Sequence, residues 1–111
     1  MFDPEITAAA TALLDLCKAK KIMLATAESC TGGLVSGALT EIAGSSAVVD
    51  RGFVTYTNDA KHQMLGVPNA TLDTFGAVSG PTAEAMARGA LGHANAHIVV
   101  AVTGIAGPTG G

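Results

Sequence analysis

The segment TAESCTGG places Ser29, Cys30 and Thr31 directly ahead of Gly32 and Gly33. An apolar run precedes the segment and a run of small residues follows it, which predicts a strand, a tight turn and the start of a helix. In such a turn Ser29 could attack a substrate, while the N–H groups of Cys30 and Thr31 stabilise negative charge on the attacked carbonyl. Gly32 and Gly33 would let a ligand approach the backbone. The structural alternative is that Ser29 or Thr31 only caps the helix.

Lys61 is the candidate base that a serine nucleophile would need. It lies one helical turn beyond a predicted strand that ends near Tyr56. A lysine in a partly dry pocket gives up its proton readily enough to act as a base, whereas the alternative is a solvated lysine on a helix surface. The histidines are poorer candidates, and the spacing of His62, His93 and His97 indicates no metal site.

A third polar segment, TGIAGPTGG, follows the last predicted strand. Its glycines, Gly104 and Gly107 among them, suit a phosphate-binding loop, but the segment lacks the G-K-[ST] ending of a Walker loop, and a flexible turn is the alternative. Thr103 is a polar residue at the mouth of an otherwise apolar strand. Because loops that follow parallel strands leave the same edge of a sheet, we expect the three polar segments to form one ligand site.

The apolar pattern predicts strands that alternate with helices. The predicted helices cover residues 4–20, 33–42, 58–65, 71–75 and 81–95, and the predicted strands cover residues 22–26, 48–57 and 97–102. Short apolar strands are typical of a buried parallel sheet. We therefore predict one α/β domain over residues 1–111, with three layers (α/β/α) and a mainly parallel or mixed sheet. Since three strands make a thin sheet, we expect part of the natural domain to lie beyond Gly111.

The composition argues against several classes of protein. A hydrophobic content of 49% disfavours disorder. A net charge of −3 with only six Lys and Arg residues predicts neither nucleic acid nor a membrane surface as a partner. No apolar run approaches the ~20 residues of a membrane span, and the N-terminus lacks a signal-peptide pattern. Cys17 and Cys30 form no disulfide framework, so we predict a cytoplasmic protein with reduced thiols.

Four motifs in the same order along the chain resemble the CinA C-terminal domain family. They are AESCTGG, SSAVVDRGFVTYTNDAKHQMLGV, VSGPTAEAMARGA and AVTGIAGPTGG. The resemblance implies a nicotinamide-nucleotide amidase of the PncC type, which converts nicotinamide mononucleotide to nicotinate mononucleotide and ammonia. It further implies Ser29 as the nucleophile, Lys61 as the base, Tyr56 and Thr103 as supporting residues, and no metal or other cofactor. It also implies further strands, a helix and a site arginine beyond the GIAGP loop.

Two hypotheses of other classes stay open at this point. The domain could hold a nucleotide without turning it over, as a binding or regulatory module, or it could be a structural domain whose open sheet edge is covered by a neighbour. The joint presence of Ser29, Tyr56, Lys61 and Thr103 favours the enzyme. We also expect a homo-oligomer. The group that binds the substrate phosphate is undecided between the helix end at residues 32–33 and the GIAGPTGG loop.

Overall fold

The computed structural model describes residues 1–106, so the candidate ligand-binding residue Gly107 lies outside the described residues. The predicted helices and strands are all present, and their ends differ from the predicted ones by up to three residues. In chain order the elements are α1 (Pro4–Lys20), β1 (Leu24–Glu28), α2 (Leu34–Thr40), the short 3-10 helix η1 (Ser45–Ala47), β2 (Val49–Val54), α3 (Asn58–Leu65), α4 (Asn69–Phe75), α5 (Gly80–His93) and β3 (Ile98–Val102).

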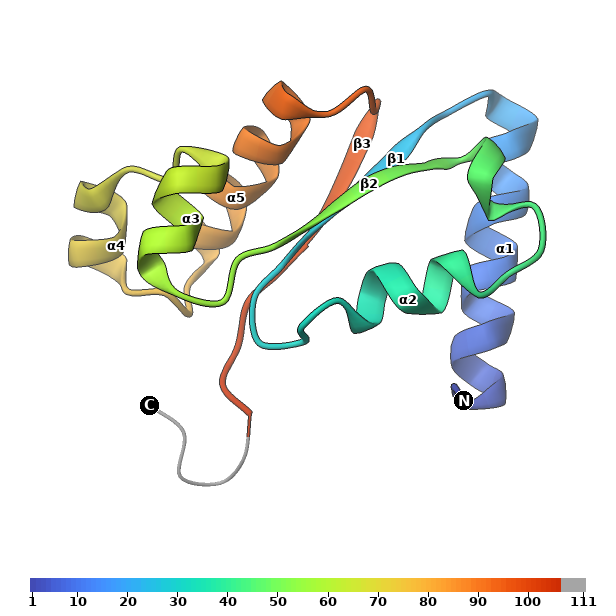
Figure 1. Ribbon diagram of the computed structural model, residues 1–111, viewed down its shortest axis with the longest axis horizontal. Helices are drawn as coiled ribbons and strands as arrows, with labels where there is room; N and C mark the ends of the chain where they lie inside the picture. The colour runs from blue at the N-terminus through green and yellow to red at the C-terminus, as the bar shows by residue number, and fades with distance from the viewer. Residues whose placement is uncertain (107–111) are drawn as a thin grey trace.

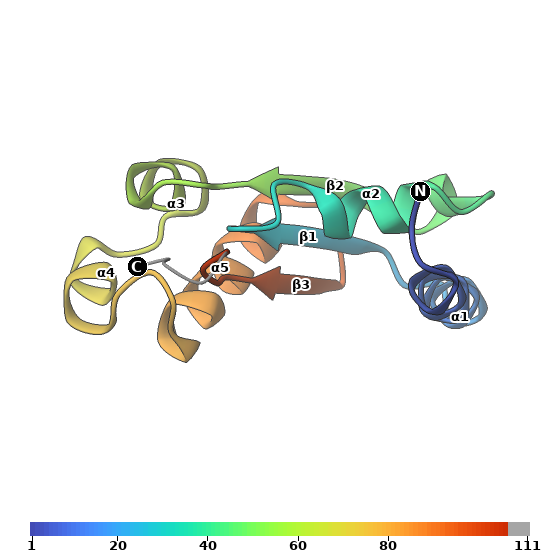
Figure 2. The same ribbon diagram turned by 90° about the horizontal axis from the view of Figure 1, so that it is seen from below.

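The sheet is parallel, with the strand order β2-β1-β3 (Figure 2). All residues of the central strand β1 are buried, as expected for a parallel strand with neighbours on both edges and helices on both faces. Leu24 of β1 pairs with Val49 of β2 and with Ile98 of β3. The carboxyl ends of the three strands therefore lie at the same edge of the sheet.

Helices cover both faces of the sheet and give three layers, which confirms the predicted α/β/α fold (Figure 1). Side chains that alternate along β1 serve the two faces in turn. Leu24 packs with Leu14 and Cys17 of α1 in one core cluster, whereas Ala27 packs with Met86 of α5 in the other. The first cluster joins α1 and α2 to the sheet, and the second joins α3, α4 and α5 to it.

Helices α3 and α5 approach each other very closely at Gly89. A Cβ atom built on Gly89 would lie 1.8 Å from the main-chain oxygen of Leu65, the last residue of α3. Only glycine leaves room for a backbone at this distance. Gly89 therefore sets the position of α3, and α3 carries the candidate base. No helix among residues 1–106 is long and apolar enough to cross a membrane.

Candidate active site

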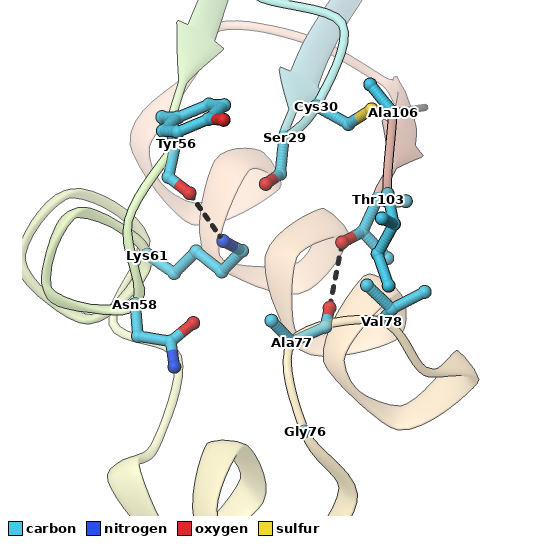
Figure 3. A pocket seen from close by; sticks show the side chains of 12 residues that line it. Ser29, Cys30, Tyr56, Asn58, Lys61, Gly76, Ala77, Val78, Thr103 and Ala106 are labelled. Atoms are coloured by element: carbon cyan, nitrogen blue, oxygen red, sulfur yellow. Dashed lines mark hydrogen bonds between the residues drawn. The ribbon is translucent and has the colours of Figure 1, made fainter. Parts of the chain in front are cut away.

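The loops that follow β1, β2 and β3 meet around a cavity of about 600 Å³ at the carboxyl edge of the sheet (Figure 3). Each of the three polar segments singled out in the sequence contributes to the lining. The predicted site residues among them are Ser29, Cys30, Tyr56, Lys61, Thr103 and Gly104. The start of α3 and the loop between α4 and α5 complete the wall. The structure thus brings together residues that lie far apart in the chain.

Ser29 lies in a tight turn between β1 and α2, and the peptide unit between Glu28 and Ser29 is hydrogen-bonded to the ends of both neighbouring strands. Its N–H donates to the carbonyl oxygen of Val102 at 2.9 Å, and Ser29 as a whole is 6% exposed. The next residue, Cys30, has a positive φ of 81°, which is uncommon for a residue with a side chain. Gly32 and Gly33 also have positive φ values, of 62° and 101°. The turn therefore reverses the chain within a few residues.

The structural alternative for this segment, in which Ser29 or Thr31 caps the helix, is wrong. Gly33 occupies the N-cap position of α2, and no side chain caps the helix from there. The hydroxyl group of Thr31 instead donates to Oε1 of Glu28 at 2.6 Å. Ser29 is left without a capping role, and its hydroxyl group faces the cavity (Figure 3).

Glu28, which the sequence analysis gave no function, satisfies the start of α2. Its Oε1 accepts the N–H groups of Gly33 at 3.2 Å and Val35 at 3.0 Å, and its Oε2 accepts the N–H of Ser36 at 2.9 Å. Burial raises the pKa of Glu28, but the hydrogen bonds from Thr31 and from these three N–H groups together outweigh it and lower the pKa below 4.5. The signal in the sequence was a glutamate at the end of an apolar strand, just before a glycine-rich turn.

The Glu28 carboxylate changes the interpretation of the predicted ligand-binding turn. The N–H of Gly33 is already bound to this carboxylate, and a phosphate at the same helix end would face its negative charge. The N–H groups of Cys30, Thr31 and Gly32 have no acceptor among residues 1–106. Of these three residues, Cys30 lines the cavity, whereas Thr31, Gly32 and the predicted ligand-binding residue Gly33 are not among its lining residues. The three N–H groups are the candidates in this turn for stabilising an anionic oxygen.

Lys61 is a buried amine, not a solvated surface lysine. It lies on α3 and is 1% exposed, and its Nζ donates to the main-chain oxygen of Tyr56 at 3.2 Å. No carboxylate within residues 1–106 forms an ion pair with it. Burial lowers the pKa of Lys61, since a charged amine without a counter-ion is poorly solvated there. In Figure 3 the Lys61 amine and the Ser29 hydroxyl point toward each other, although no hydrogen bond joins them.

The two supporting residues contact the site in different ways. Tyr56 touches Lys61 through its main-chain oxygen, while the tyrosine side chain lies at the mouth of the cavity and the residue is 71% exposed. The hydroxyl of Thr103 donates to the carbonyl oxygen of Ala77 at 2.8 Å and so ties the loop after β3 to the loop before α5. Asn58, which sequence reasoning did not select, also lines the cavity from the first turn of α3.

The histidines are engaged with the main chain away from the cavity. Nδ1 of His62 lies 2.8 Å from the oxygen of Val67, and Nδ1 of His97 accepts the N–H of Met23 at 2.9 Å. Within the described part of the chain, no three His, Cys, Asp or Glu side chains gather as metal ligands would.

The fold and the cavity together define a three-layer α/β domain with a serine and a buried lysine at the carboxyl edge of a parallel sheet. The family model of the CinA C-terminal domain matches residues 6–111. The chain therefore belongs to the CinA C-terminal domain family, which confirms the resemblance seen in its motifs.

Relatives and solved structures agree with this assignment. The nicotinamide-nucleotide amidohydrolase PncC of Enterobacter agglomerans is 57% identical over 94 residues, which are 85% of this chain and 57% of that protein. PncC of Escherichia coli K12 is 50% identical over 111 residues, all of this chain and 67% of the relative. The crystal structure of the competence/damage inducible protein CihA from Agrobacterium tumefaciens superposes with a TM-score of 0.96 at 62% identity, over 100% of this chain and 67% of that one. The chain thus spans 57% to 67% of the length of these proteins.

Proposed function

We propose that the protein is an amidohydrolase that converts nicotinamide mononucleotide to nicotinate mononucleotide and ammonia, with Ser29 as nucleophile and Lys61 as base. The observation that carries this proposal is a buried lysine that has no counter-ion among residues 1–106 and faces a serine hydroxyl across a cavity. A lysine in that state is neutral over a wider pH range than usual and can take a proton. The names of the PncC relatives support a nicotinamide nucleotide as the substrate.

The proposed reaction begins when the neutral Lys61 amine accepts the proton of the Ser29 hydroxyl. The serine oxygen then bonds to the carboxamide carbon, and the carbonyl oxygen becomes negatively charged. The N–H groups of Cys30, Thr31 and Gly32, which have no acceptor among the described residues, are the candidate donors to this oxygen. Loss of a single donor of this kind lowers the rate of amide hydrolysis by ~100- to 1,000-fold.

The second half of the reaction returns both residues to their starting state. The carbon–nitrogen bond breaks while the Lys61 ammonium gives its proton to the departing nitrogen, which leaves as ammonia. An acyl group then remains on Ser29. Lys61 takes a proton from a water molecule, the water oxygen attacks the acyl carbon, and the serine oxygen leaves with the proton from Lys61. The product is the free carboxylic acid.

The phosphate of the substrate belongs, in this proposal, at the loop that begins with Gly104. The other candidate, the start of α2, is disfavoured because the Glu28 carboxylate already accepts the N–H groups there. Gly104 lines the cavity, whereas the later glycines of this loop lie outside the described residues.

The test is the release of ammonia from nicotinamide mononucleotide by the wild-type chain and by Ser29→Ala, Lys61→Met and the control Ser46→Ala. Ser46 is an exposed serine in η1 with no side-chain hydrogen bond to any described residue, so its variant should keep the wild-type rate. Ser29→Ala and Lys61→Met should each lose almost all activity while they stay folded. An acyl group trapped on Ser29 and detected by mass spectrometry would identify the nucleophile directly.

Two outcomes would overturn the amidase. One is a folded Ser29→Ala variant that retains the wild-type rate. The other is a wild-type chain that binds nicotinamide mononucleotide in calorimetry and never releases ammonia, under conditions in which the E. coli relative does. The second outcome would favour the nucleotide-binding module.

A further inference from the structure

The side chain of Glu28 is the most extensively hydrogen-bonded buried group beside the cavity. Glu28 is fully buried (0% exposed), and its two oxygens accept four hydrogen bonds. The donors are the hydroxyl of Thr31 and the N–H groups of Gly33, Val35 and Ser36. No cation among the described residues pairs with the carboxylate. An ionised carboxylate in such a place is tolerated only because these donors replace its water.

The main chain around Glu28 is fixed as firmly as its side chain. Its carbonyl oxygen accepts the N–H of Thr55, at the end of β2, at 2.8 Å. The following N–H, that of Ser29, donates to Val102, at the end of β3, at 2.9 Å. The turn that carries Ser29 is therefore held at its first residue by both neighbouring strands. The Glu28 side chain holds its far end, where Gly33 enters α2.

Between the fixed ends of the turn, at Ser29 and Gly33, the backbone adopts a conformation that is unfavourable by itself. Cys30 has a φ of 81°, and such a conformation persists only where the surroundings impose it. The same stretch contains the N–H groups of Cys30, Thr31 and Gly32, which have no acceptor among the described residues. Without the carboxylate, the first N–H groups of α2 would need other acceptors. The turn would then be free to change its conformation to satisfy them.

We propose that Glu28 is a positioning residue for the reaction. Its carboxylate accepts the first N–H groups of α2 and so fixes the turn at residues 30–32. The N–H groups of that turn thereby stay free for the negatively charged oxygen of the transition state. This inference rests on the proposed function. A donor that acts on charge developed during the reaction affects the transition state more than the bound substrate. Loss of Glu28 should therefore lower kcat and leave KM nearly unchanged.

The first experiment compares Glu28→Gln with Glu41→Gln. Glutamine has the shape of glutamate but carries no charge, and its NH₂ group accepts no hydrogen bond. Either the N–H of Ser36 or the N–H groups of Gly33 and Val35 therefore lose their acceptor. We expect kcat to fall by ~100-fold or more, similar to the loss of one oxyanion donor, with KM within about threefold of wild type. Glu41 is the exposed C-cap residue of the same helix, so the same substitution there should change neither constant. The pH at which Lys61 loses its proton should stay the same in Glu28→Gln.

Measurements on folded protein separate positioning from a purely structural role. Circular dichroism gives the folded fraction of each variant, and kcat is expressed per folded molecule. A Glu28→Gln protein that is folded and keeps kcat within about twofold of wild type would overturn the inference. If Glu28→Gln does not fold, Thr31→Val removes only the 2.6 Å hydroxyl donor and should still lower kcat by about tenfold. An unchanged kcat in that variant would overturn the inference as well.

The inference can also fail or survive independently of the amidase. The backbone NMR shifts of Cys30 report its positive φ in the wild type and in Glu28→Gln, whether or not either protein turns over a substrate. We expect these shifts to move, or the signals to broaden, in Glu28→Gln and not in Glu41→Gln. If the wild type is inactive and the shifts still change, the amidase is refuted while the anchoring of the turn stands. If the Cys30 shifts of Glu28→Gln are the same as those of the wild type, the anchoring of the turn by Glu28 is refuted.

Discussion

The close contact between α3 and α5 leads to a prediction that links packing to the candidate base. In Gly89→Ala the new Cβ would lie 1.8 Å from the Leu65 oxygen. Real Cβ atoms essentially never come closer than 3.0 Å to a heavy atom, so the two helices must separate by about 1.2 Å (3.0 minus 1.8). The obstacle is a main-chain carbonyl and not a flexible side chain, so no rotamer change can relieve the clash.

The expected change in stability follows from two opposed effects. Overpacking of this kind costs about 1–3 kcal/mol, while replacing glycine by alanine within a helix contributes about 0.5–1 kcal/mol in favour of folding. Because rigid backbone must move, we expect Gly89→Ala to lose about 2 kcal/mol of unfolding free energy. Gly92→Ala is the matched control, since nothing lies within 4 Å of a Cβ there and the residue is on the same helix. That variant should gain up to about 1 kcal/mol.

Urea unfolding followed by circular dichroism measures both variants. A separation of α3 from α5 also lets water reach Lys61, so its pKa should return toward 10.5 and the proposed amidase reaction should require a higher pH. If Gly89→Ala is as stable as Gly92→Ala, the helices are not held by this contact and the reasoning fails. A destabilised Gly89→Ala with an unchanged pH profile would show that the position of α3 does not control the base.

Two further predictions concern the buried ionisable groups. Between the lowered folded pKa of Lys61 and 10.5, the unfolded chain binds a proton that the folded chain has lost. In this pH range the free energy of unfolding of the wild type should therefore rise with pH relative to that of Lys61→Met. Urea titrations across this range should show that rise, and a constant difference would contradict it. For Glu28 the sign is the same at a lower pH: because its folded pKa is lowered, the stability it contributes is complete above pH 4.5 and is lost as the pH falls through the folded pKa. Acid titrations should therefore show a steeper loss in the wild type than in Glu28→Gln, and parallel curves would refute the lowered pKa.

The sequence alone was sufficient for the order of the helices and strands and for the sheet edge at which the candidate site lies. Helix α3 has the predicted bounds. It ends at the glycine at residue 66, as the sequence indicates, and the cap at its start is the side chain of Thr57, which accepts the N–H of Ala60. Strand β1 was predicted two residues too early, since hydropathy extended it back to Ile22 and stopped it at Thr26. The strand in fact runs on to Glu28, because main-chain bonds to both neighbouring strands decide its end.

The parts of the site that were missed depend on contacts between distant segments. No local pattern distinguishes a solvated lysine from one buried by the packing of α3, and so the state of Lys61 stayed open. The role of Glu28 was missed for a related reason: a carboxylate in an apolar strand looks unfavourable until its four donors are known. Tyr56 was expected only as a supporting residue, and its contact with Lys61 is made by its main-chain oxygen.

The order of the strands has a consequence for protein synthesis. The central strand β1 is made early, but Leu24 must wait for Ile98, 74 residues later (98 minus 24), before its second edge is paired. At a typical synthesis rate of about 5–20 residues per second, this interval lasts roughly 4–15 s on the ribosome. During that time the turn that carries Ser29 has no Val102 to hold it, and an apolar strand edge is open to other chains. The candidate site of a nascent chain is therefore incomplete until β3 has docked, and we expect chaperones to bind the chain in this interval.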